Sequence, residues 1–531
     1  MKLNRGKRIA KSAAAVFTAA ALMVSGAATV FAGGTYQDYE KEAVEALVTG
    51  LMESWDKDME NYDKSMAGSN TQLILKAEDA GKSLLSIMTG LDFSWLETIA
   101  LDMDVSMIDG NQAIDTELLL NDGHIATAKV FADVSNMMQY MQIPELSESY
   151  LGGLLTMTGE AEAYEMYDES MQMYLDMMAD ITSYIPDSAV VETLLERYLN
   201  IIIDGMQEGA SVEEAVSLGG IEEACTMYEG NLFVEDLIAV AETLLTTARD
   251  DQELKNLIET YAVESSEEDL YAEFQDSIND ALDELAVEES AAEADEYFSS
   301  RIWVNAENEI VAREFALMDG AYEDFMITWE NPQAGDESAL LLEIYSEGSA
   351  ITLTGTTQTT DGMKRGSYIF AIDYGVIANV EMENYDVAAA EAGSLKATYT
   401  ISFPQPETDE EEAVYNPLSA CGGILDVDIN GETGEQTYVL TVTSGGAALA
   451  SLTLTGGYGD GVEVPDLEGV EFYDMVSNDD MNAYAEEITF DEIFEYASAA
   501  GMPELFVNML QSTVEEAFYG SSAEATADVA A

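Results

Sequence analysis

The sequence has 531 residues, in which 19 Lys and Arg stand against 104 Asp and Glu, and its formal net charge is −85 at pH 7. A surface this acidic repels nucleic acid and anionic lipid, so neither is an expected partner. Hydrophobic residues make up 47% of the chain, including 27 Tyr and 16 Phe, which excludes a disordered chain and predicts a packed core.

Residues 1–32 have the pattern of a secretory signal peptide. Basic residues between Lys2 and Lys11 precede an apolar stretch that ends at Ala32. Val30 and Ala32 suit the two positions that a signal peptidase inspects, so we expect cleavage after Ala32 and an extracellular protein. A lipoprotein needs a Cys directly after the cleavage point, where this chain has Gly33, so no stable membrane anchor is expected.

The first part of the mature chain reads as one helix followed by strands. Residues 33–66 form the expected helix, and residues 67–159 form the first part of a sheet domain. There Leu101, Met103 and Val105 alternate with acidic or polar residues, as in an antiparallel strand with one buried face. Asp-Gly pairs at 109–110 and 122–123 mark hairpin turns.

Residues 160–300 lose this alternation and are expected to form a helical insertion. Phe233, Leu237 and Leu244 follow helical spacing, for example. Gly219 and Gly230 are interpreted as breaks between helices.

Alternation returns in residues 301–475, the second part of the sheet domain. Turn signals at Asp361–Gly362 and Asn430–Gly431 separate the runs, and Tyr368, Phe370 and Tyr374 are expected on one apolar face. Helices close the chain at 476–519, and residues 520–531 are expected to be a mobile tail.

The predicted fold class is α+β, with a curved antiparallel sheet like a half-barrel, a large helical insertion and terminal helices. The two strand regions are expected to join in one sheet, because either alone would leave an open edge and an uncovered apolar face.

Four stretches resemble a group of exported proteins of Gram-positive gut bacteria, and this resemblance implies no activity or catalytic residue. The stretches are FSWLETIALDMDVSM, YMQIPELSESYL, LIAVAETLLTTARDDQELKNLIE and RIWVNAENEIVAREFAL. In architecture alone, a strand meander with helices is similar to the half-barrel of lipoprotein carriers and related lipid-binding proteins.

Catalytic motifs are not found, so the protein is not expected to be an enzyme. His124 is the single histidine. With one histidine, neither a two-histidine metal site nor a Ser-His-Asp arrangement is expected. Cys225, placed in the helical region, and Cys421 are candidates for a disulfide, although two buried thiols are favoured.

Asp426, Asp428 and Asn430 reproduce the opening of an EF-hand loop, but the last ligand is missing and the flanks read as strands. A hairpin turn explains the same residues. No cofactor is expected, and weak Ca²⁺ binding by surface carboxylates stays open.

Methionines form a cluster that suits either core packing or an adaptable ligand surface; it includes Met171, Met173, Met177 and Met178. Together with Tyr368, Phe370 and Tyr374, they are the expected lining of an apolar ligand site between sheet and helix. The leading hypothesis is a non-enzymatic binding protein for an apolar or amphipathic small molecule. The alternative is an acidic surface-interaction or structural protein that binds cations or basic partners, and the sequence identifies no protein partner.

Overall fold

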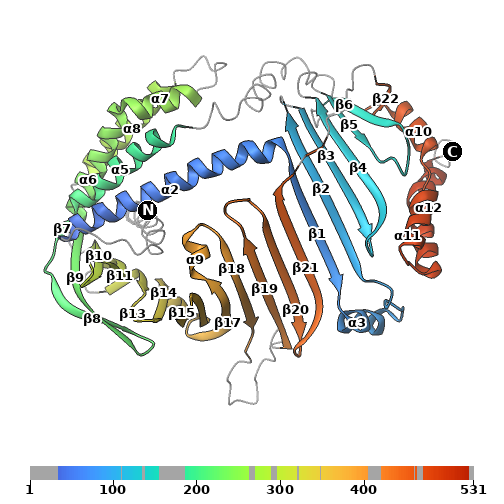
Figure 1. Ribbon diagram of the computed structural model, residues 1–531. Coiled ribbons are helices and arrows are strands. Elements are labelled where there is room, and N and C mark those ends of the chain that lie inside the picture. The colour runs from blue at the N-terminus through green and yellow to red at the C-terminus, as the bar shows by residue number, and fades with distance from the viewer. Residues whose placement is uncertain are drawn as a thin grey trace. The chain divides into compact units, whose positions relative to one another are not determined.

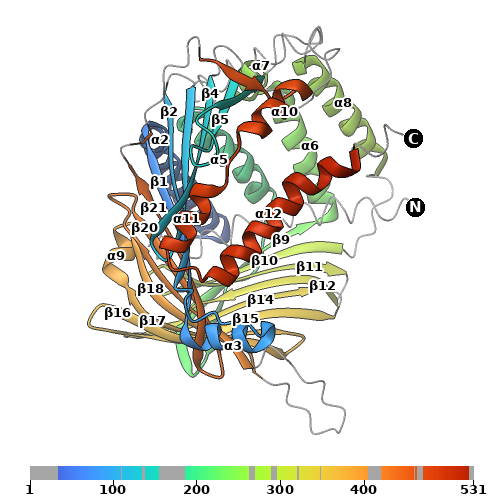
Figure 2. The same cartoon turned by 90° about the vertical axis from the view of Figure 1, so that its right-hand side faces the viewer.

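The computed structural model describes residues 34–108, 111–133, 138–154, 186–261, 270–288, 296–319, 322–346, 348–404, 420–459, 461–462 and 470–525. Over these residues the protein is α+β, with curved antiparallel sheet structure that does not close, accompanied by helices (Figures 1 and 2). The predicted fold class is therefore confirmed.

The described residues divide into two compact units, each discontinuous in sequence. Unit 1 takes its residues from Met1–Met59, Ile181–Tyr385 and Ser402–Asn416. Unit 2 takes its residues from Glu60–Asp180, Asp386–Ile401 and Pro417–Ala531. Helix α2 runs without a break from Tyr36 to Ala67 and contributes to both, as the helix expected at 33–66.

Unit 1 contains an antiparallel sheet in the order β8-β9-β10-β11-β12-β14-β15-β16, with short β7 beside β9 and β13 beside β14. Its elements after α2 are α5 (Ser188–Gly205), β7 (Gln207–Glu208), β8 (Val212–Leu218), β9 (Ile221–Phe233), α6 (Val234–Asp250), α7 (Gln252–Tyr261), α8 (Leu270–Glu288), β10 (Glu296–Asn305), β11 (Ile310–Asp319), β12 (Tyr322–Glu330), β13 (Gln333–Ala334), β14 (Glu337–Ser346), β15 (Ser349–Thr360), β16 (Met363–Ile372) and β17 (Gly375–Asp386).

Unit 2 has the strand order β19-β20-β21-β1-β2-β3-β4-β5-β6-β22, antiparallel except for the parallel pair β6 and β22. Its elements are β1 (Ser69–Ala77), α3 (Asp79–Thr89), β2 (Thr98–Ile108), β3 (Asn111–Leu120), β4 (Gly123–Asp133), β5 (Met138–Gln142), β6 (Tyr150–Leu154), α9 (Val387–Glu391), β18 (Leu395–Ser402), β19 (Cys421–Ile429), β20 (Gln436–Ser444), β21 (Ala447–Tyr458), β22 (Phe472–Asp474), α10 (Asn478–Glu487), α11 (Asp491–Ala499) and α12 (Glu504–Ala525).

Strands β1 and β21 join the two strand regions of the sequence. All nine residues of β1 pair with β21, from Ser69 with Tyr458 to Ala77 with Ala450 (Figure 1). The last strands of the second region, β19–β21, therefore share a sheet with the first region within unit 2, whereas β11–β16 of the second region lie in unit 1.

The core of unit 1 lies between helices and the sheet. One stripe of α2 repeats every three or four residues and packs on α5, α6 and strands β9–β11. Its buried members are Tyr36, Tyr39, Ala43, Val44, Val48 and Met52. Glu40 lies in the same stripe, where both carboxylate oxygens accept hydrogen bonds from Nη1 of Arg313 on β11, at 2.7 and 2.8 Å. Both side chains of this ion pair are buried.

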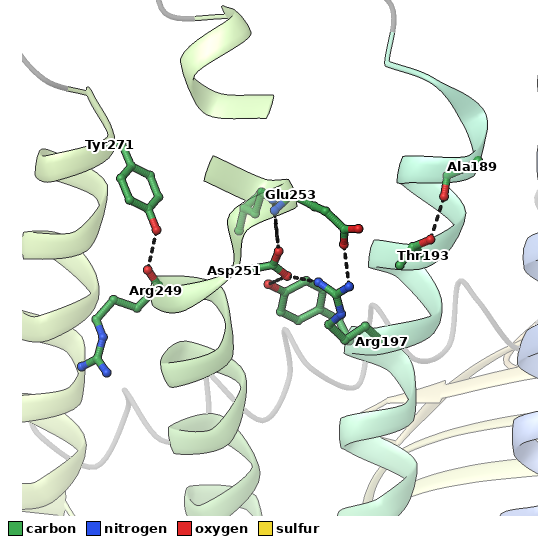
Figure 3. Close-up of polar contacts among 9 residues, drawn as sticks. Ala189, Thr193, Arg197, Arg249, Asp251, Glu253 and Tyr271 are labelled. Atoms are coloured by element: carbon green, nitrogen blue, oxygen red, sulfur yellow. Dashed lines mark hydrogen bonds and ion pairs between the residues drawn. The ribbon is translucent and has the colours of Figure 1, made fainter. Parts of the chain in front are cut away.

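A polar junction fixes the helices of unit 1 (Figure 3). Arg197 on α5 donates hydrogen bonds to Asp251 and Glu253 at the start of α7, and the Tyr198 hydroxyl donates to Asp251 at 3.0 Å. The other Asp251 oxygen accepts the backbone N–H groups of Glu253 and Leu254 and so caps α7. Burial raises the pKa of Asp251, but Arg197 and these donors outweigh it and hold the pKa below its usual value.

The segment 160–300, expected to be helical, contains strands β7, β8 and β9 and the start of β10, and that expectation is wrong there. Gly219 and Gly220 have φ of 60° and 87° and form the two-residue turn of the β8–β9 hairpin. The alternation of apolar and polar residues is not visible in the sequence of these strands, because Glu214 and Glu223 lie on the same face as the buried Val216. They accept hydrogen bonds from the Trp303 indole at 3.3 Å and from the Asn305 amide at 2.8 Å.

Helices α10, α11 and α12 follow β22, as expected for residues 476–519 (Figure 2). Helix α12 extends to Ala525, so residues 520–525 are helical rather than part of a mobile tail. Residues 1–33 and 526–531 lie outside the described residues. Among the described helices, none has the length and apolar character needed to cross a membrane.

Candidate functional site

The most unusual surface of unit 2 is an apolar sheet face that remains exposed. We call it the apolar strip; its members are Leu73, Leu75, Ile99, Leu101, Leu440, Val442, Leu452 and Leu454. They lie on β20, β21, β1 and β2, which are neighbours in the sheet, and between 37% and 46% of each residue is exposed.

Strand register places seven of these eight side chains in two rows across the sheet, and Val442 lies beside the first row on β20. One row runs from Leu440 through Leu452 and Leu75 to Ile99. The second row runs through Leu454 and Leu73 to Leu101. Because side chains directly opposite one another in adjacent strands are close, each row forms a continuous apolar track.

The alternation of burial is the reverse of that in an ordinary amphipathic sheet. On β2, Ala100 is 5% exposed although its neighbours Ile99 and Leu101 are 39% and 41% exposed. The side of the sheet opposite the strip carries polar side chains beside Ile74 and Val439, and there Asn70 donates hydrogen bonds at 2.9 Å to both Asp102 and Asp104. The apolar side is therefore the one that lacks cover in the described structure.

Helices α11 and α3 flank the strip. Leu118 and Leu120 on β3 continue the two rows, and they pack against Ile493 and Ala497 of α11. Helix α3 packs on β21, where Gly81 lies so close to the Leu449 carbonyl that a Cβ at Gly81 would stand 2.0 Å from its oxygen. These contacts cover the surroundings and leave the rows on β20, β21, β1 and β2 open.

His124 forms the most concentrated ionisable cluster near this face. Its Nδ1 lies 2.7 Å from Glu117 and its Nε2 lies 2.7 Å from Glu145, while the Tyr496 ring of α11 meets the imidazole edge-on at 5.3 Å. Burial lowers the pKa of His124, but hydrogen bonds with the two carboxylates outweigh it and raise the pKa above its usual value. When the ring is protonated, both nitrogens donate to these carboxylates, and the imidazolium links β4 to the segment before β6.

The His124 cluster makes stability depend on pH. We expect His124→Gln to lower the free energy of unfolding more at about pH 5.5 than at about pH 9. The raised pKa means that the stabilisation is complete below the unfolded-state pKa of about 6.5 and is lost as the pH rises through the folded-state value. Urea denaturation of both proteins at the two pH values tests this, and an equal loss at both would contradict it.

The expected aromatic lining lies in unit 1 and is divided. Tyr368 and Phe370 are half-buried on β16, opposite Gly355 and Leu353. Tyr374 does not continue their face, because it lies with Asp373 in the turn after β16, at φ of 64°, and is 76% exposed. Met171, Met173, Met177 and Met178 lie outside the described residues.

The residues of the suspected calcium loop do not converge. Asp426 accepts a hydrogen bond from the Thr398 hydroxyl at 2.7 Å, and Asp428 pairs with the Lys396 ammonium at 2.6 Å. Asn430 instead caps the N–H groups of the following loop. That loop spans 430–435, with the positive φ at Gly434, so the two-residue Asn430–Gly431 turn is wrong. Within the described ranges, no three His, Cys, Asp or Glu side chains are grouped to hold a metal ion.

Both cysteines are free thiols. Cys225 lies on β9 of unit 1, not in a helix as expected, and burial raises the pKa of its thiol to about 11. Cys421 begins β19 of unit 2. The Cys225 thiol is therefore protonated at neutral pH and poorly reactive.

A groove of about 420 Å³ in unit 1 is polar, and neither Tyr368, Phe370 nor Tyr374 lines it. The β8–β9 turn and strands β14–β17 form it. Glu337, Glu381 and Glu383 line it together with Arg365, and Ser367 donates a hydrogen bond to Glu381 at 2.9 Å. This lining suits small polar or cationic groups rather than an apolar ligand.

The strip went unrecognised in the sequence, although its signal was there. Leu101 stands in a recognised alternating run, and the pairs Leu73 with Leu75 and Leu452 with Leu454 alternate in the same way. Alternation reports which side chains share a face and does not report whether that face is covered.

A scan against protein-family models finds no matching family, and searches of the curated proteins and of the solved structures find no matching protein or structure.

Proposed function

We propose that the protein is a secreted, non-enzymatic binding protein for an apolar or amphipathic small molecule, which lies on the apolar strip of unit 2. The observation that carries the proposal is the strip itself, whose eight side chains remain 37–46% exposed. Contiguous apolar surface of this kind on a folded protein marks an interaction site, since isolated exposed leucines would be unremarkable.

The shape of the strip suits an extended ligand. One row crosses β20, β21, β1 and β2, and the other crosses β21, β1 and β2. Strands lie about 4.8 Å apart, so the longer row offers an apolar track of roughly 15 Å. A hydrocarbon chain or a flat ring system covers such a track by apolar contact alone. Covering the remaining exposed surface of one leucine contributes about 1 kcal/mol.

Export fits this function. The signal-peptide pattern of residues 1–32 would bring the protein outside the cell, where apolar molecules need a carrier or a scavenger in water. The competing proposal, an acidic protein that binds cations or basic partners, does not explain an exposed leucine surface.

A neutral probe tests the proposal. The fluorescence of N-phenylnaphthylamine should rise on binding and saturate at micromolar protein. The double substitution Leu73→Thr and Leu454→Thr should weaken binding of the probe about tenfold. These two residues are cross-strand partners in the middle of the strip, and threonine keeps the strand propensity. Organic-solvent extracts of protein purified from its natural host should also contain an apolar compound.

The matched control changes the opposite face. Ile74 on β1 and Val439 on β20 lie on the opposite face of the same sheet. Ile74→Thr with Val439→Thr should therefore leave probe affinity unchanged. If the probe does not saturate, or if both double variants weaken it equally, the binding protein is abandoned in favour of the acidic interaction protein.

A further inference from the structure

The side chains around the apolar strip determine which head-group charge is favoured in an amphiphile bound there, because the strip itself is uncharged. No Lys, Arg or His follows Lys396 in the sequence. The basic side chains of unit 2 are Lys64, Lys76, Lys82, Lys129, Lys396 and His124.

Each of these basic side chains already has a carboxylate partner within unit 2. The distances are 2.9 Å for Lys64 to Glu60, 2.8 Å for Lys76 to Glu78, 2.8 Å for Lys82 to Glu97, 3.8 Å for Lys129 to Asp115 and 2.6 Å for Lys396 to Asp428. His124 has two, Glu117 and Glu145. An anionic head group would therefore have to displace a carboxylate from its cation.

Beside the strip lie further carboxylates, which pair with no cation among the described residues. Helix α11 packs on Leu118 and Leu120, the next strand positions after the strip, and exposes Asp491, Glu492 and Glu495 to solvent. Helices α10, α11 and α12 contain no Lys or Arg. A head group that projects beyond the strip toward α11 meets a negative potential within a Debye length of about 8–10 Å.

We infer that the occupant of the apolar strip is an amphiphile with a cationic head group, such as an alkylammonium. This inference rests on the proposed function and specifies its ligand class. The apolar rows hold the tail, and the unpaired carboxylates of α11 favour the cationic head, while an anionic head of the same tail length is repelled.

Three dodecyl compounds that differ only in head-group charge test the inference. Dodecyltrimethylammonium, a neutral dodecyl glycoside and dodecyl sulfate are titrated calorimetrically into the full chain below micelle formation, at about 20 mM and about 0.5 M NaCl. At low salt the cation should bind at least about tenfold more tightly than the sulfate, and high salt should reduce the ratio below about threefold.

Variants separate the head from the tail. Glu492→Gln with Glu495→Gln should reduce the preference for the cation at least about threefold and leave the glycoside unchanged, while Leu73→Thr with Leu454→Thr should weaken all three compounds. The matched charge control is Glu242→Gln with Glu273→Gln on α6 and α8 of unit 1, which should leave the preference unchanged.

The outcomes distinguish this inference from the proposed function. Binding of the glycoside with equal or tighter binding of dodecyl sulfate would overturn the cationic ligand and leave the binding function standing. Binding of none of the three would overturn both. A dimer that forms without amphiphile and dissociates on Leu73→Thr with Leu454→Thr would assign the strip to a second copy of the chain and would also overturn the inference.

Discussion

Replacement of Arg313 by methionine is expected to lower the free energy of unfolding of unit 1 by about 3–5 kcal/mol. Arg313 and Glu40 are buried, and both Glu40 oxygens accept from the same guanidinium nitrogen. Methionine fills much of the volume but leaves the Glu40 carboxylate without its counter-charge. Two compact units need not unfold together, so hydrogen exchange of the peptides that cover β10 and β11 is the suitable measurement.

Two control variants show whether charge rather than packing is responsible. Glu40→Leu combined with Arg313→Met removes both charges and should recover most of the loss, because apolar pairs replace buried ion pairs at little cost. Lys64→Ala breaks the exposed pair with Glu60 and should have little effect on stability. A double variant no more stable than Arg313→Met would show that the guanidinium is needed for shape instead.

The second large effect is expected from Ile302→Ala, at about 2–5 kcal/mol. Ile302 on β10 is 0% exposed and lies in the core beneath α2, so its removal leaves a cavity that the packed helices cannot close. Ile351→Ala on β15 is the matched control in the same unit. Ile351 is 45% exposed, and its truncation should cost less than about 1 kcal/mol.

The same exchange measurement decides this case, read on the peptides of β9 and β10. Ile302→Ala should speed exchange there strongly, and Ile351→Ala should have little effect. Equal effects of the two substitutions would contradict the placement of the core between α2 and the sheet.

Local patterns in the sequence predicted much of the fold. The stripe of α2 appears at helical spacing, and the Asp361–Gly362 pair predicted the turn that joins β15 to β16, with φ of 51° and 81°. Alternation in β2 and β20 predicted strands with one apolar face. These features depend on a few neighbouring residues, so one sequence is enough to find them.

The failures arose where tertiary partners decide the structure. Glu214 and Glu223 look like residues of an acidic helix until Trp303 and Asn305 supply their hydrogen bonds in the sheet. The pairing of β1 with β21 joins residues far apart in the sequence, so the row from Leu440 to Ile99 could not be assembled from local pattern. The contact of His124 with Glu145 likewise forms only in the folded chain and could not be found from local pattern.

The central claim, that an apolar ligand occupies the strip, is tested most directly by finding where such a ligand lies. A neutral dodecyl alcohol that carries a diazirine is bound to the full chain and photolysed, and the labelled peptides are identified by mass spectrometry. We expect saturable labelling on β1, β2, β20 and β21, with Leu73 and Leu454 at its centre, and an excess of unlabelled alcohol should reduce it. Saturable labelling confined to unit 1, or labelling that unlabelled alcohol does not reduce, would contradict the claim.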